Sequence, residues 1–175
     1  MLDEPRMRNA LLYILDALPP RESTLHKIFK ILWFADISHM KDWGRFITGD
    51  TYFKLEFGPV PTLLYNILKG IGANNPRYND YKNDVSVDGY YVTPLKKPDF
   101  DELSESDVEA LKKSIDENKD LTMAQLTYKS HGHAWNASED KNEIHLESIF
   151  DEIGMPHKER QLILEGEAFA RALSG

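Results

Sequence analysis

One carboxylate in this sequence is placed where it could do acid–base chemistry. Asp36 falls within a predicted helix, on the same helical stripe as the apolar residues Leu25, Phe29, Leu32 and Met40. Its side chain should point toward the core, where a carboxylate needs a partner or several hydrogen bonds. Arg45 follows the predicted end of this helix and could fold back as a bidentate partner. A buried acid of raised pKa could be a general acid or base, but no second catalytic group lies nearby in the sequence. We therefore favour a structural ion pair between Asp36 and Arg45.

The histidines are the other candidates for chemistry. The stretch HGHAW places His131 and His133 two residues apart, but no carboxylate stands at a supporting helical spacing, so the metal signal is weak. We expect instead that Gly132 ends a helix capped by Thr122. His131 would then lie near that helix's C-terminal dipole, with Trp135 packed beneath it.

No further reaction pattern is present in the sequence. It has no cysteine, which removes disulfides, thiol nucleophiles and cysteine-based metal sites. Nucleophile-elbow, phosphate-loop and zinc-protease patterns are also absent. The sequence therefore predicts a protein that is not an enzyme and that has no cofactor and no metal.

The charge of the chain is unevenly distributed. Its net charge is −8, but residues 1–98 carry 13 basic and 11 acidic side chains, whereas residues 99–175 carry 8 and 18. So acidic a chain gains little from counterion release, which makes nucleic acid an unlikely partner. The acidic half could attract a basic protein or simply keep helix faces solvated. The apolar run 10–18 is too short to be a signal peptide or to cross a membrane, and we expect a cytoplasmic protein with no membrane contact.

Apolar spacing predicts a mostly α-helical chain with a small antiparallel β-sheet, an α+β fold in a single domain over residues 1–175. A helix over residues 25–41, capped by Ser23 or Thr24, is apolar nearly all round and should be central. The sheet should hold one strand over residues 51–57, with Phe53, Leu55 and Phe57 on one face, and a β-hairpin turning at Asp88-Gly89. The other predicted helices cover residues 6–18, 61–71, a segment capped by Ser104, a segment capped by Thr122, 146–153 and 156–173.

The stretch GPVP, residues 58–61, is predicted to be a rigid corner between the strand and the next helix. Gly58 can adopt a conformation closed to other residues, and each proline holds its predecessor extended. Such a corner could serve folding alone. It could also be a binding platform that loses little conformational entropy when a partner binds, because it is already rigid. On the second interpretation the residues that contact a partner protein are Tyr52, Lys54, Phe57, Pro59, Val60, Pro61 and Tyr65. The strand face that carries Tyr52 could equally meet a second copy of the chain.

The same region resembles a known family. The stretch KILWFADISHMKDWGRFITGDTYFKLEFGPVPTLLYNIL is similar to the signature of Panacea-domain proteins, which include SocA-like antitoxins and phage-associated GepA-like proteins. LSESDVEAL and SHGHAW match the second half of that family, so the resemblance covers about residues 6–150. Trp33 departs from the pattern, which more often has tyrosine there. The segment 156–173 lies outside the matched part.

The resemblance implies a mostly helical domain that acts as the antitoxin of a toxin–antitoxin pair. It would bind directly to a cognate toxin protein encoded by an adjacent gene, and no catalytic residue is implied. The alternative implied by the resemblance is an adaptor that delivers a bound client to an ATP-dependent protease. For that role, the segment 156–173 is the available second contact.

Overall fold

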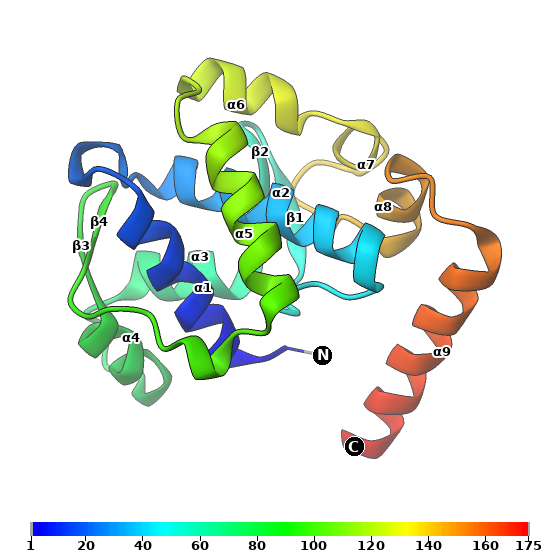
Figure 1. The fold of residues 1–175 in the computed structure, drawn as a ribbon, viewed down its shortest axis with the longest axis horizontal. Coiled ribbons are helices and arrows are strands. Elements are labelled where there is room, and N and C mark those ends of the chain that lie inside the picture. Colours follow the sequence, from blue (N-terminus) through cyan, green and yellow to red (C-terminus); the bar gives the residue numbers. More distant parts are fainter. Residues whose placement is uncertain (1, 175) are drawn as a thin grey trace.

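The computed structural model describes residues 2–174, which fold into nine α-helices and two separate two-stranded antiparallel sheets (Figure 1). The predicted fold class, mostly α with a small antiparallel β component, is confirmed. The helices are α1 Glu4–Ala17, α2 Leu25–Trp43, α3 Thr62–Gly70, α4 Asn79–Asp84, α5 Glu105–Asn118, α6 Met123–Ser130, α7 His133–Asn136, α8 Leu146–Glu152 and α9 His157–Ser174. The strands are β1 Tyr52–Leu55, β2 Gly58–Pro61, β3 Val85–Asp88 and β4 Tyr91–Pro94.

Helix α2 is the central element, as its apolar circumference predicts. It packs against α1, α5, α6 and β2, and α5 crosses it in Figure 1. The Thr24 hydroxyl caps it by accepting from the Lys27 N–H, and Gly44 ends it in the left-handed conformation at φ 71°. Because α2 is surrounded on most sides, even its polar residues Lys30, Asp36 and His39 are buried.

The apolar core has one large cluster and two smaller ones. The large cluster joins α1, α2, α3 and α5 with the β3–β4 hairpin. A second cluster gathers Trp33, Tyr52 and Ile149, and a third gathers Met40, Phe150 and Met155. The two smaller clusters attach α8 to the far end of α2, so the segments after residue 130 are held by α2 as well.

Residues 58–61 form a strand, and the prediction of a rigid corner is therefore wrong. β2 pairs with β1 in the register Tyr52↔Pro61, Lys54↔Pro59 and Leu55↔Gly58. The two prolines are compatible with a strand because they stand two residues apart, so both missing N–H groups lie on one edge. That edge faces away from β1, since the Pro59 carbonyl accepts from the Lys30 amino group at 2.7 Å. The structure thus contains two hairpins rather than one hairpin and a lone strand.

Gly58 does have the special conformation that the sequence suggests. Its φ is +103°, and a Cβ there would lie 2.3 Å from the Ser130 hydroxyl oxygen and 2.8 Å from Cε of Lys30. Gly58→Ala should therefore lower the free energy of unfolding by about 2–4 kcal/mol in urea denaturation, through clash and backbone strain. Gly89→Ala is the matched control, because Gly89 has φ +59° with nothing within 4 Å, and should cost only about 1 kcal/mol. Equal losses for the two variants would show that the close packing at Gly58 contributes nothing.

Several predicted boundaries shift by a residue. The second hairpin is confirmed, but its two-residue loop is Gly89-Tyr90, because Asp88 pairs with Tyr91. Helix α3 starts at Thr62, with Pro61 as its N-cap residue. Pro61 has no side-chain oxygen to cap with, and the Asp50 carboxylate instead accepts from the N–H groups of Leu63 and Leu64 at 3.1 Å. The predicted caps Ser104 and Thr122 are both confirmed as capping boxes.

The predicted C-terminal helix is α9, which extends away from the other helices in Figure 1. Its first half contacts the body through Ile163, which lies against Gly44 and the third apolar cluster. Leu162, Phe169 and Leu173 are more than 60 % exposed. Within the described part of the chain, no helix combines the length and apolar character needed to cross a membrane.

Candidate protein-binding groove

Asp36 is fully buried, as predicted, and is held by hydrogen bonds rather than by an arginine. The Ile47 N–H and the Tyr52 hydroxyl each donate to its carboxylate at 2.7 Å, and the Thr48 hydroxyl donates at 3.0 Å. The Thr48 N–H makes a longer fourth contact. Burial raises the pKa of Asp36 to about 6, although these donors act in the opposite direction. Asp36 therefore ties α2 to the segment that leads into β1.

The expected ion pair between Asp36 and Arg45 is wrong. The Arg45 guanidinium points to α5 instead, where it donates to Asp107 at 2.8 Å and to the Ser104 hydroxyl at 3.3 Å. The reason is topological, because Gly44 turns the chain so that Arg45 lies at the surface while Ile47 and Thr48 return to the core beside Asp36. The sequence could not indicate Asp107 as the partner, since the pair spans 62 positions.

Asp107 also organises a buried histidine that the sequence analysis did not single out. His39 Nδ1 lies 2.9 Å from the Arg45 carbonyl, an acceptor only, so Nδ1 carries the proton. Nε2 lies 3.0 Å from the Ser106 hydroxyl and 3.2 Å from Asp107. Burial lowers the pKa of His39, whereas the Asp107 carboxylate acts in the opposite direction. The group is enclosed and joins α2 to the start of α5.

The histidine pair has the arrangement expected from the sequence for His131. This residue ends α6, and its ring stacks on Trp135 with centroids 3.6 Å apart and an interplanar angle of 6°. His133 begins α7 on the other side of Gly132 and faces Asp151 at 3.9 Å. In residues 2–174, no group of three or more histidine or carboxylate side chains is gathered as a metal would need.

Of the seven residues predicted to contact a partner, three are buried and three are half-buried. Tyr52, Pro59 and Pro61 are buried, so they cannot form a binding surface in this fold. Tyr52 turns inward, and its hydroxyl donates to Asp36. The strand face that carries Tyr52 therefore lies against the core, whereas Phe53 and Leu55 on the other face are half-buried. Phe57 at the hairpin loop is 51 % exposed, whereas Val60 and Tyr65 are half-buried against the main core.

Lys54 and the edge of β1 are also engaged within the chain. The Lys54 amino group lies 4.2 Å from the Trp135 ring centroid and donates to the Ser138 carbonyl at 2.9 Å. Residues 141–144 run along the outer edge of β1, with backbone hydrogen bonds at both Tyr52 and Lys54. This edge is therefore occupied within the chain, and the Tyr52 side chain is itself buried, so neither offers a contact to a second copy in this fold.

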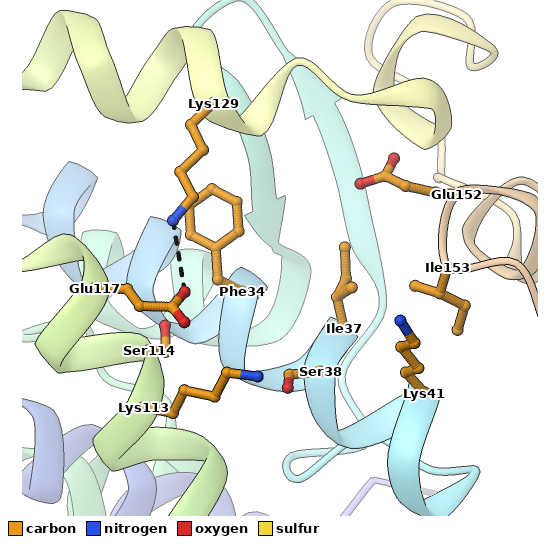
Figure 2. A pocket seen from close by; sticks show the side chains of 10 residues that line it. All are labelled: Phe34, Ile37, Ser38, Lys41, Lys113, Ser114, Glu117, Lys129, Glu152 and Ile153. Carbon is orange, nitrogen blue, oxygen red and sulfur yellow. Dashed lines mark ion pairs between the residues drawn. The ribbon is translucent and has the colours of Figure 1, made fainter.

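A hollow on the described surface lies where α2, α5, α6 and α8 meet (Figure 2). We call it the groove; it has a volume of about 320 Å³. Its floor is apolar and is formed by the half-buried side chains of Phe34, Ile37 and Ile153. Its polar lining consists of Ser38, Lys41, Lys113, Ser114, Glu117, Lys129 and Glu152.

The charges of the groove are only partly satisfied within the protein. Lys129 donates to the Asn118 side chain at 2.7 Å and lies over the Phe34 ring at 4.5 Å, and Glu117 is 3.8 Å away (Figure 2). Glu152 accepts from the Ala134 N–H at 2.6 Å and so belongs to the start of α7. Lys41 and Lys113 are exposed and have no ion pair or hydrogen bond through their amino groups among the described residues. The groove thus presents two available ammonium groups above an apolar floor.

A second, smaller hollow continues the groove toward the end of α2. It shares Ser38 and Lys113 with the first and reaches Trp43, whose side chain is 63 % exposed and stacks on His39. Asp42 and Glu109 line this end, so the charge changes sign along the surface. Trp33 and Trp43 both belong to α2, and no pattern in the sequence separates the exposed Trp43 from the buried Trp33.

Comparison with known families identifies the chain. A family model described as "Antitoxin SocA-like, Panacea domain" matches residues 28–136, more than half of the chain. The chain therefore belongs to the SocA-like, Panacea-domain family of antitoxins, as its sequence motifs indicated. Neither the curated proteins nor the solved structures gave a match to the chain.

Proposed function

We propose that this protein is the antitoxin of a toxin–antitoxin pair and neutralises a cognate toxin protein, encoded by an adjacent gene, by binding it directly. The observation that carries the proposal is the family match over residues 28–136, which contains most of α2 and all of α5 and α6. These three helices supply most of the groove. The part of the chain that matches the family model therefore also builds most of the groove.

The proposal assigns no catalytic step to the chain. Asp36, the best candidate for acid–base chemistry, is 0 % exposed and accepts from three neighbouring residues, so a substrate cannot reach it. His39 is enclosed in the same way between Arg45, Ser106 and Asp107. Both groups stabilise the fold, which is in keeping with a protein that acts by surface recognition.

We further propose that residues 1–175 act as one domain in the cytoplasm. The reason for one domain is that α2 packs against elements from both halves of the chain, including α1, α5 and α6. The net charge of −8 favours a protein partner over nucleic acid.

The proposal is tested by expressing the adjacent gene alone and together with this chain, scoring growth and co-purification. We expect growth arrest by the neighbour alone, and rescue together with a stable complex when both are present. A frameshift of the chain's gene, which keeps the transcript but not the protein, is the control for rescue by protein. Arrest that the intact chain does not relieve would contradict the proposal, and so would a neighbour that leaves growth unchanged.

A further inference from the structure

We propose that the groove binds an amphipathic helix of the partner, with apolar residues against Phe34, Ile37 and Ile153 and carboxylates beside Lys41 and Lys113. This inference rests on the proposed function, because the partner is the toxin. It adds the surface that is used and the chemistry of the segment that occupies it.

The floor of the groove favours an apolar ridge on the partner. Phe34 and Ile37 stand three residues apart on α2, on the same helix face, and remain half-buried after the chain has folded. Ile153 closes the far side from the end of α8. Apolar side chains from a partner would remove this floor from water at a gain of about 25 cal/mol per Å² buried.

The walls of the groove favour carboxylates. Lys113 from α5 and Lys41 from α2 lie on the groove wall, and no described carboxylate pairs with either amino group (Figure 2). Charged groups are screened over about 8 Å at physiological ionic strength, so the charges that line the groove matter most. Of its two carboxylates, Glu117 lies 3.8 Å from the Lys129 amino group and Glu152 accepts from the Ala134 N–H. Acidic side chains on the partner would pair with them, whereas basic ones would be repelled.

A helix fits this surface better than a strand. The hollow is bounded by helices. The outer edge of β1 could otherwise accept a strand, but residues 141–144 already cover it. From Phe34 to Trp43 the surface follows α2 for roughly 14 Å, which is between two and three turns of a partner helix.

The second hollow sets the direction of the partner helix. Trp43 is large and exposed and is of the residue type most enriched among binding hot spots. Asp42 and Glu109 surround it, so the partner's carboxylates belong at the Lys41–Lys113 part, and a neutral or basic residue belongs beside Trp43. The partner helix should therefore be acidic at one end only.

The test uses the full chain co-expressed with the product of the adjacent gene. We expect Lys41→Glu/Lys113→Glu to weaken binding of the co-purified partner by roughly 10–100-fold and to abolish rescue of growth. The matched control is Lys112→Glu/Lys158→Glu, which changes the net charge equally at exposed lysines that do not line the groove and should rescue as the wild type does. Thermal unfolding of both double variants verifies that they fold.

The chemistry of the partner is tested by charge exchange. Lysines in place of the carboxylates of one amphipathic partner helix should restore binding to the Lys41→Glu/Lys113→Glu variant and weaken binding to the wild type. If the wild type rescues growth and the groove variant rescues equally well, the inference is wrong and the proposed function stands. If the wild type itself neither binds nor rescues, the proposed function fails first.

Discussion

Replacing Asp36 by alanine should lower the free energy of unfolding by about 3–5 kcal/mol, as measured by urea denaturation at pH 7. The loss is large because the Ile47 N–H, the Thr48 hydroxyl and the Tyr52 hydroxyl all donate to this one carboxylate in the core. Each donor would remain buried without an acceptor. Asp36→Asn keeps the volume and one acceptor oxygen, so it should lose only about 1–3 kcal/mol.

Arg45→Ala is the control that separates this hydrogen-bond cluster from an Asp36–Arg45 ion pair. Arg45 contacts Asp107, and Asp107 keeps its hydrogen bonds within the Ser104 capping box when the arginine is removed. Arg45→Ala should therefore cost only about 1 kcal/mol. A loss for Arg45→Ala as large as that for Asp36→Ala would contradict the observed partners.

Replacing Lys30 by methionine should raise the free energy of unfolding by about 2–4 kcal/mol at pH 6. Lys30 is 1 % exposed, and the Pro59 carbonyl is the acceptor of its hydrogen bond. Burial lowers the pKa of its amino group to about 7. At pH 6 the folded protein must therefore hold a charged amine in its interior, a cost that methionine of similar length removes.

The pH dependence fixes the sign of this effect. Below pH 7 the amine is charged in both the folded and the unfolded state and the full penalty is present, whereas above its ordinary pKa of 10.5 it is neutral in both states and the penalty is gone. The stability of the wild type should thus rise between pH 7 and pH 10 relative to Lys30→Met. Lys27→Met is the control on the same helix. Lys27 forms an ion pair with Glu22 at 2.6 Å, so its replacement by methionine should lower the free energy of unfolding. A Lys30→Met variant that is less stable than the wild type at pH 6 would contradict the prediction.

Local features of the fold could be predicted from the sequence because their causes are local. The Thr24, Ser104 and Thr122 caps each need only a side chain and the backbone three residues on. The central position of α2 follows from its apolar circumference, and the burial of Asp36 follows from its stripe. The β3–β4 hairpin follows from a glycine between two β-rich runs, although the turn lies one residue further along.

The features that the sequence could not predict depend on contacts between distant segments. The burial of Tyr52 depends on Asp36, which belongs to another element. The alternation of Phe53, Leu55 and Phe57 alone would place their face of the strand against the core instead. The sequence did not predict the strand at residues 58–61, because prolines usually exclude a strand. Only the register shows that the edge on which both prolines lack an N–H faces away from β1.

The groove could not be predicted for a related reason. Its lysines come from α2, α5 and α6, and each looks like an ordinary exposed residue within its own helix. Their proximity depends on how the three helices pack, and so does the absence of a described partner for the amino groups of Lys41 and Lys113. In contrast, the family assignment needed only the continuous motif and is confirmed over residues 28–136.

Direct neutralisation is measured best by calorimetric titration of the purified chain into the purified product of the adjacent gene. We expect a saturable one-to-one complex with a Kd below about 1 µM, as an interface of standard size supports. The Lys41→Glu/Lys113→Glu variant should give little or no heat under the same conditions, and Lys112→Glu/Lys158→Glu should match the wild type. Absence of binding by the folded wild-type chain, to a neighbour whose toxicity the chain nevertheless relieves, would contradict neutralisation by direct contact.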